Sequence, residues 1–263
     1  MQDMNSAICN TAYTPSNVTG SSALLKTSRA DYTATTSGTT QVAQRTLYDY
    51  RGIDGTGTAS SPATGSNQVS YTVRKLADGN CWMTDNLKLT LSTSHSYEVG
   101  TFDGGTASWT PNSGSGDAYN VAINANTKAN VNGGNWYYPW YAATAGQGTN
   151  TANPTISRSI CPKGWRLPNG SDNTAPSFQS IVDKYSATTP DKIKATPLSY
   201  TAVGLYGSGN PNYTSYGYYW SANSYSSNSN FAYHLLFTTS NVNPQYYNSS
   251  KYYGFSVRCV AIP

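Results

Sequence analysis

The chain has 263 residues, of which 37% are hydrophobic and only 11% are charged. A typical soluble domain carries about 25% charged residues, so Ser, Thr, Asn, Gly and Tyr must cover much of this surface, as they do in extracellular proteins. The net charge of +4 is spread along the chain without a cluster of Lys and Arg, which argues against a nucleic-acid-binding protein. No apolar run approaches the roughly 20 residues that span a bilayer.

The N-terminal part of the chain divides into an arm and the start of a domain. Residues 1–45 are rich in Ser, Thr and Ala and have little periodicity, which predicts an arm or linker before a single domain at 46–263. Residues 47–50 and 69–76 alternate apolar and polar side chains, as half-buried strands do. The Gly/Ser/Thr-rich segment between them, 52–67, is therefore predicted to be the loop of a long hairpin.

The middle of the chain offers an aromatic cluster and one helix. The cluster Trp-Tyr-Tyr-Pro-Trp-Tyr at 136–141 favours a place in the core over a sugar-stacking platform, because aromatic side chains bury the most area where aliphatic ones are scarce. A helix is predicted from about Pro176, with one buried stripe at residues 178, 181, 182 and 185. With short strands and long loops elsewhere, the fold class is α+β.

The cysteines favour two disulfides. The four cysteines are far apart in the sequence and form no Cys-x-x-Cys pair. The chain has only two histidines that could help them bind a metal. Disulfides also suit the extracellular composition. Three connectivities are possible, and we favour Cys9 with Cys81 and Cys161 with Cys259.

The last third of the chain has an unusual composition. No Asp or Glu follows Asp191, so 72 residues lack a carboxylate, and residues 211–253 contain 10 Tyr, 9 Ser and 7 Asn. Apolar anchors alternate with other residues at 233–237 and 255–259, which predicts two ordered strands instead of a disordered tract. The Tyr/Ser/Asn segments around these strands have the chemistry of antibody-like binding loops, in which Tyr gives contact area and Ser and Asn give adaptable hydrogen bonds.

Four blocks of sequence, in order, carry a resemblance to a known family. They are Asp-Gly-Asn-Cys-Trp-Met-Thr-Asp-Asn-Leu at 78–87, Cys-Pro-Lys-Gly-Trp-Arg-Leu-Pro at 161–168, Tyr-Trp-Ser at 219–221 and Gly-Phe-Ser-Val-Arg-Cys-Val at 254–260. Together they resemble the Fibrobacter succinogenes major paralogous domain. The resemblance implies a C-type lectin-like fold of the formylglycine-generating-enzyme type, in which an Arg-Leu-Pro segment leads into a helix and a Gly-Phe-x-x-Arg strand closes the domain.

The tail at about 206–260 further resembles the variable region of a protein diversified by a retroelement. In such systems, the resemblance implies, adenines of a template repeat are randomised during reverse transcription, and Asn codons become codons for Tyr, Ser, Asn and other residues. The resemblance assigns ligand contact to the positions between the fixed anchors. These positions are Tyr213, Ser215, Tyr216, Tyr218, Ser224, Tyr225, Ser227, Asn228, Asn230, His234 on the outward face of its strand, Tyr246, Tyr247, Asn248, Tyr252 and Tyr253.

The anchors themselves are expected to form a rigid scaffold. Each buried aliphatic or Phe side chain contributes about 1.5 to 3 kcal/mol, and a rigid frame limits the cost of ordering side chains on binding. Tyr218 and Tyr253 have the alternative of packing under the loops. The anchor positions are Trp220, Tyr233, Leu235, Phe237, Phe255 and Val257.

We expect a cell-surface or extracellular binding protein whose partner is a protein or glycan on another cell or a phage. Nucleic acid is not an expected partner, and this chain is not expected to insert into a membrane. Residues 1–4 lack the basic and apolar regions of a secretory signal. The signal and any anchor are therefore expected to be absent from this chain.

Three other functions are weighed against this one. A non-diversified, carbohydrate-binding adhesin is the main alternative. Calcium needs several carboxylate or carbonyl oxygens, but the acid-free tail has Trp-Ser-Ala-Asn at 220–223, where the resemblance to animal C-type lectins implies a Trp-Asn-Asp type ligand group. No cofactor is predicted, although a structural calcium at Asp85, Asp103 or Asp117 stays open. An oxidase of the formylglycine-generating type would need a pair of reactive thiols. A hydrolase would need catalytic acids or a nucleophilic serine, but the chain has one glutamate and no Gly-x-Ser-x-Gly motif. The protein is therefore not expected to be an enzyme.

Overall fold

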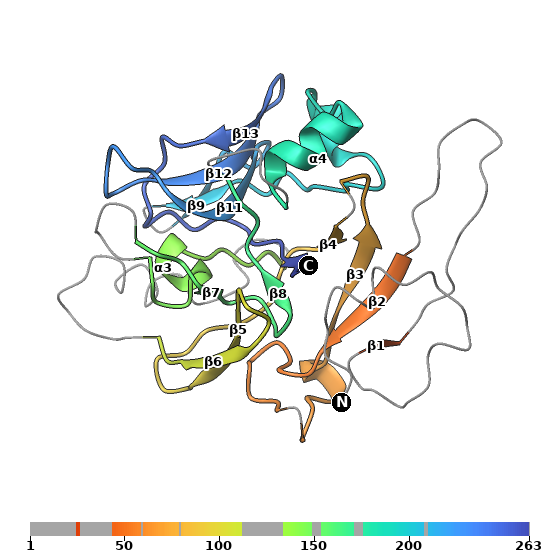
Figure 1. Cartoon of the computed structure of the whole chain (residues 1–263), viewed down its shortest axis with the longest axis vertical. Coiled ribbons are helices and arrows are strands. Elements are labelled where there is room, and N and C mark those ends of the chain that lie inside the picture. Colours follow the sequence, from red (N-terminus) through yellow and green to blue (C-terminus); the bar gives the residue numbers. More distant parts are fainter. Residues whose placement is uncertain are drawn as a thin grey trace.

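The predicted hairpin opens the largest sheet of the molecule (Figure 1). The computed structural model describes residues 25–26, 44–58, 60–78, 80–111, 134–148, 154–170, 176–207 and 210–262. Strands β2 (Gln44–Asp49) and β3 (Val69–Lys75) pair antiparallel, with Leu47 opposite Tyr71. Both of these side chains are buried, so the alternation predicts this hairpin correctly. Its loop contains a single 3-10 turn, η2 (Gly65–Asn67).

The largest sheet joins the beginning of the described chain to its end. Its order is β1-β2-β3-β4-β14-β8, with every neighbouring pair antiparallel. The C-terminal strand β14 therefore lies between two strands from earlier in the sequence. The remaining members are β1 (Leu25–Lys26), β4 (Cys81–Met83), β8 (Trp165–Arg166) and β14 (Val260–Ala261).

Three smaller antiparallel sheets complete the β structure. The most important carries the Tyr/Ser/Asn-rich tail and has the order β11-β12-β13. It lies in the upper part of Figure 1, in blue. The other two sheets pair β9 with β10 and place β5 between β6 and β7. Their strands are β5 (Tyr97–Thr101), β6 (Thr106–Trp109), β7 (Arg158–Ser159), β9 (Leu205–Gly207), β10 (Asn210–Asn212), β11 (Gly217–Ser224), β12 (Ala232–Phe237) and β13 (Val242–Tyr246).

The predicted strand at 233–237 is confirmed as β12, but the predicted closing strand at 255–259 is wrong in its form. Residues 255–259 are all buried, so they do not alternate between core and solvent. This segment has neighbours on both sides, with isolated bridges from Phe255 to Tyr138 and from Ser256 to Tyr219. Regular pairing begins only with β14.

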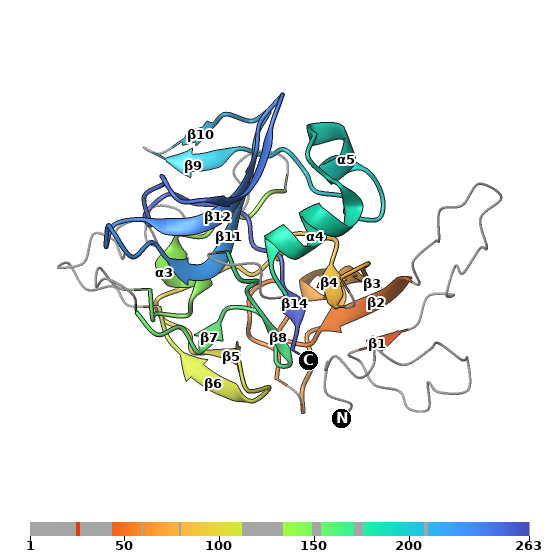
Figure 2. The same ribbon diagram turned by 45° about the horizontal axis from the view of Figure 1, so that its top comes forward.

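The predicted helix is α4 (Phe178–Tyr185), which buries Phe178, Ile181 and Val182. It begins two residues after Pro176, because Ser177 is the N-cap and forms a reciprocal capping box with Ser180. Its buried stripe packs between β11 and β12 on one side and β4 on the other (Figure 2). The other α-helices of the described residues are α3 (Trp140–Ala143) and α5 (Pro190–Lys194). Within the described ranges, no helix is long and apolar enough to cross a membrane.

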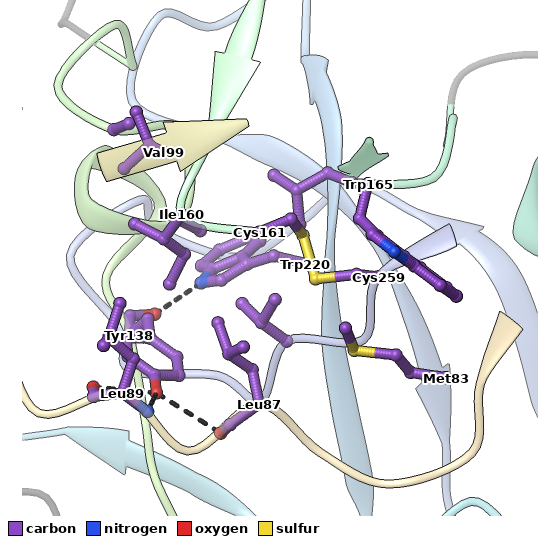
Figure 3. Close-up of a cluster of buried hydrophobic side chains, with 14 of the residues drawn as sticks. Met83, Leu87, Leu89, Val99, Tyr138, Ile160, Cys161, Trp165, Trp220 and Cys259 are labelled. Carbon is purple, nitrogen blue, oxygen red and sulfur yellow. Dashed lines mark hydrogen bonds between the residues drawn. A yellow bond between two sulfur atoms is a disulfide. The ribbon is translucent and has the colours of Figure 1, made fainter. Parts of the chain in front are cut away.

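Aromatic side chains pack in the core beside aliphatic ones, as Tyr138, Trp165 and Trp220 do in Figure 3. Tyr137, Tyr138 and Trp140 are buried while Trp136 and Tyr141 are half-buried, which confirms the core interpretation of the 136–141 cluster. The Tyr138 hydroxyl hydrogen-bonds the backbone at Leu89, with the Leu89 N–H donating at 2.7 Å. The described chain is thus an α+β fold with few helices and mostly antiparallel strands.

A disulfide joins Cys161 to Cys259 across 98 residues of sequence, as predicted. It connects the segment before β8 to the buried segment before β14, so it fastens two central elements of the molecule (Figure 3). Cys81 is also disulfide-bonded. Cys9 lies outside the described residues.

Removal of this disulfide is expected to destabilise the protein strongly. A cross-link that closes a loop of about 100 residues contributes up to about 4.7 kcal/mol. We expect the double variant Cys161→Ala/Cys259→Ala to lose about 3 to 5 kcal/mol of unfolding free energy in urea denaturation. Cys81 is unchanged in this variant, so its own disulfide stays intact, which treatment with a reducing agent would not allow. A loss of unfolding free energy below about 1 kcal/mol would contradict a strong stabilising role of the Cys161–Cys259 disulfide.

Candidate ligand-binding face

The exposed aromatic side chains of the described chain all lie in the tail. In the part of the molecule that the structure describes, the exposed large hydrophobic residues are Tyr213 at 63%, Tyr247 at 47%, Tyr253 at 38% and Tyr252 at 36% exposure. All four belong to the positions predicted for ligand contact. Exposed aromatics favour association when they gather on one surface, so their arrangement decides what they can do.

A continuous row of aromatic rings links the two ends of this group. The row runs from the turn before β11, across β11, β12 and β13, to the loop between β11 and β12. We call it the tyrosine row. Its successive ring-centroid distances are 5.8 Å for Tyr213 to Tyr216, 6.5 Å for Tyr216 to Tyr218, 6.1 Å for Tyr218 to His234, 5.3 Å for His234 to Tyr246, 6.3 Å for Tyr246 to Tyr247 and 4.5 Å for Tyr247 to Tyr225.

The tyrosine row rests directly on the core. Tyr218 packs against Phe255 at 4.9 Å, and Phe255 stacks on Trp220 at 4.0 Å. Tyr253 reaches the same Phe255 ring at 6.4 Å. One buried ring therefore supports both the middle of the row and the exposed tyrosine on the closing loop.

The loop that carries Tyr247, Tyr252 and Tyr253 is held by Lys251. The Lys251 N–H donates to the Asn230 carbonyl at 2.9 Å, and the Lys251 carbonyl accepts from the Trp140 N–H at 2.9 Å. The Lys251 side chain is fully buried, with its ammonium 4.6 Å from the centroid of the Trp140 ring. This cation–π contact and the backbone bonds fix the loop between the exposed tyrosines.

The smaller residues of the predicted site vary in exposure. Ser215, Ser227 and Asn248 are exposed, whereas Asn228 and Asn230 are half-buried. Ser224 is buried at 9% exposure. The tyrosine row is thus bordered by hydroxyl and amide groups, which can donate and accept hydrogen bonds with a ligand.

The prediction that His234 faces outward is wrong. Its side chain is fully buried, because the rings of Phe255, Tyr246 and Trp220 surround it at centroid distances of 4.9, 5.3 and 5.6 Å. Its Nε2 lies 3.3 Å from the Ser249 hydroxyl oxygen. Tyr218, at 7% exposure, is also covered, so these two central rings of the row are buried, while Tyr213 and Tyr247 toward its ends are exposed.

Tyr233 also differs from its predicted place in the scaffold. Leu235 and Phe237, on the same face of β12, are fully buried, but Tyr233 is only half-buried. Its ring packs edge-on against Tyr225 at 5.6 Å and against Tyr247 at 6.3 Å. Tyr233 therefore extends the exposed aromatic surface beyond the predicted positions.

A cleft of about 550 Å³ opens beside this end of the tyrosine row. Sequence reasoning did not find it, because its lining comes from distant parts of the chain and no motif marks them. Apolar groups of Phe102, Pro154 and Ile156 face it, together with Ala222 and Tyr233. Its polar lining consists of Asn169, Asn223, Ser224 and Ser226.

The carboxylates considered for calcium are used in local hydrogen bonds. Asp85 accepts from the Thr72 N–H, and Asp103 accepts from the Thr101 hydroxyl. Asp117 lies outside the described residues. Among the residues with a described position, no three His, Cys, Asp or Glu side chains come together as metal ligands.

Comparison of the chain with known proteins assigns it to no family. No protein-family model, no curated protein and no solved structure matches the chain. The function of the face is therefore inferred from its own chemistry and from the sequence motifs.

The exposed tyrosines are expected to tolerate replacement. Substitutions at exposed sites change the unfolding free energy by about 0.5 kcal/mol or less, so Tyr213→Ser, Tyr247→Ser and Tyr252→Ser should each stay within that range. Tyr218→Ser is the matched control, and the loss of its buried ring should cost about 3 kcal/mol. Urea denaturation measures both, and equal losses at exposed and buried positions would contradict the division.

His234 should make stability depend on pH. Burial lowers the pKa of His234 from 6.5 to about 3, so the imidazole stays neutral in the folded protein while the unfolded chain binds a proton below pH 6.5. The contribution of this group is therefore fully present above pH 6.5 and is lost at up to about 1.4 kcal/mol per pH unit as the pH falls toward 3.

Urea denaturation over this pH range measures the effect. His234→Gln should remove this part of the slope, because its amide does not titrate. The control His95→Gln changes the other histidine, which is half-buried, and should keep the slope. An unchanged slope in His234→Gln would show that this imidazole does not titrate as described.

Proposed function

We propose that this protein binds a ligand at the cell surface through the tyrosine row, and that the row is displayed on a C-type lectin-like scaffold diversified by a retroelement. The observation that carries the proposal is the location of the exposed aromatic side chains. Every exposed large hydrophobic residue of the described chain is a tyrosine of the Tyr/Ser/Asn-rich tail. Exposed aromatic side chains favour association with another molecule, so their presence supports a binding role.

The chemistry of the row supports recognition of a varied partner. Tyr offers a large contact area at a small cost in conformational entropy, and its hydroxyl adds a polar group. The bordering Ser and Asn side chains adapt their hydrogen bonds to the partner. The ligand is a protein or a glycan on another cell or a phage, and neither nucleic acid nor a membrane is part of the proposal.

The buried anchors support diversification of the surface above them. Trp220, Leu235, Phe237, Phe255 and Val257 are all fully buried. Their packing does not depend on the identity of Tyr213, Tyr247 or Tyr252 at the surface. Codon changes at exposed positions can therefore alter the ligand without unfolding the frame.

The oxidase alternative finds little support in the cysteines. That chemistry needs reactive thiols, whereas Cys161 and Cys259 are bonded to each other and Cys81 is disulfide-bonded as well. The thiolate is the reactive form of cysteine, and a disulfide offers none. The proposal therefore assigns binding and no catalytic activity to the protein.

Sequencing the encoding locus in several clonal isolates tests the proposal. We expect a nearby near-copy repeat that differs at adenines, an adjoining reverse transcriptase gene, and substitutions concentrated at Tyr213, Tyr247, Tyr252 and Tyr253. The buried Trp220 codon in the same segment is the internal control and should not change. A uniform tail in all isolates, with no repeat, would contradict diversification.

Direct binding provides the second measurement. A display library randomised at the four exposed tyrosines should yield folded binders to unrelated protein targets. A matched library randomised at four buried anchors should yield few folded proteins, because each lost core side chain costs about 2 to 5 kcal/mol. Failure of the first library to yield any binder would contradict a binding role for the face.

A further inference from the structure

The cleft beside Tyr233 has the chemistry of a binding site that the tyrosine row alone does not explain. Its volume of about 550 Å³ lies within the roughly 300 to 1,000 Å³ of small-molecule sites. Its lining combines aromatic rings, Phe102 and Tyr233, with side-chain amides and hydroxyls. None of the described residues that line it is charged.

Close backbone contacts hold the polar lining in place. The Gly170 N–H donates to the Asn223 Oδ1 at 2.8 Å, which fixes the orientation of the Asn223 amide. A Cβ at Gly170 would lie 2.1 Å from the Ser221 hydroxyl and 3.0 Å from the Tyr233 Cβ. Only glycine therefore lets the 169–170 segment approach β11 and β12 this closely.

The other polar and aromatic groups are also held from behind the cleft. The Arg166 guanidinium lies 5.3 Å from the centroid of the Phe102 ring and donates to the Asn169 Oδ1 at 3.0 Å. Arg166 itself is not part of the lining. Its contacts fix an aromatic ring and an amide, while the cleft presents uncharged groups to a ligand.

A ligand that fits this lining has apolar faces and many hydroxyl groups. Amides and hydroxyls donate and accept hydrogen bonds with hydroxyl groups, and aromatic rings cover apolar C–H surface. A neutral sugar ring has both features. The described lining offers no charged group that could form an ion pair with a phosphate, a carboxylate or a charged peptide side chain.

We propose that this cleft binds the neutral terminal sugar of a glycan, without calcium, and that the tyrosines Tyr225, Tyr233 and Tyr247 contact the sugars that follow. The inference rests on the proposed binding function of the tail and names a ligand class for one end of it. Tyr225 and Tyr247 stack at 4.5 Å, and Tyr233 packs edge-on against both. The glycan therefore leaves the cleft onto an aromatic surface.

Ser226 and Ser227 offer a matched pair of variants for the test. Both are exposed, but only Ser226 lines the cleft. Ser226→Trp fills the cleft without touching the core, and Ser227→Trp adds the same ring next to it. Thermal denaturation of both variants establishes that they fold like the parent protein.

The full chain is applied to an array of neutral and acidic glycans, with and without EDTA, and the strongest binder is then titrated by calorimetry. We expect binding to neutral glycans with one terminal sugar in common, unchanged by EDTA. Ser226→Trp should weaken the affinity by at least about tenfold, and Ser227→Trp should change it by less than about twofold.

Four outcomes would overturn the inference: no glycan bound, acidic glycans only, loss of binding in EDTA, or equal affinities of the two Trp variants. Tyr213→Ser separates this result from the proposed function. If Tyr213→Ser weakens ligand binding, or the display library yields binders, while Ser226→Trp leaves the affinity unchanged, the cleft inference fails and the binding face stands. If Ser226→Trp alone abolishes glycan binding and the tail is uniform among isolates, the cleft stands and diversification fails.

Discussion

The structure depends on the burial of β11 on both of its faces. Trp220 packs into one core cluster, where it stacks on Phe255 and donates its indole N–H to the Tyr138 carbonyl at 2.7 Å. The neighbouring Tyr219 points into the other cluster, toward α4, and its hydroxyl donates to the Thr201 carbonyl at 2.9 Å. A strand fixed from both sides gives β12 a firm edge on which to pair, and β13 pairs with β12 in turn, so this sheet positions Tyr218, His234 and Tyr246 of the row.

A second constraint keeps the region behind β11 in place. Arg258 is buried and donates to the carbonyls of Leu198 and Ser199 at 2.7 and 2.6 Å. Its guanidinium also lies 4.1 Å from the centroid of the Tyr200 ring. Because a buried charge is costly unless its hydrogen bonds are satisfied, these contacts oblige the 198–200 segment to stay against the final part of the chain. The Gly-Phe-x-x-Arg block thus has a direct structural use here.

Much of the framework could be predicted from local patterns, because each of those patterns is compatible with only one type of secondary structure. The stripe at residues 178, 181 and 182 predicts α4, and the alternation in 47–50 and 69–76 predicts the hairpin. The alternation around His234 could not reveal its burial, since alternation separates two faces of a strand without showing that both are covered, here by Trp220 and Phe255 on the His234 side. The cleft was beyond prediction for another reason: Phe102, Ile156 and Asn223 meet only through tertiary folding.

The buried Lys251 has a consequence for how the two ends of its loop behave. Its ammonium lies against Trp140 and its backbone is hydrogen-bonded on both sides, so the chain is anchored between Tyr247 and Tyr252. All three exposed tyrosines of this loop therefore lie within four residues of one buried attachment point.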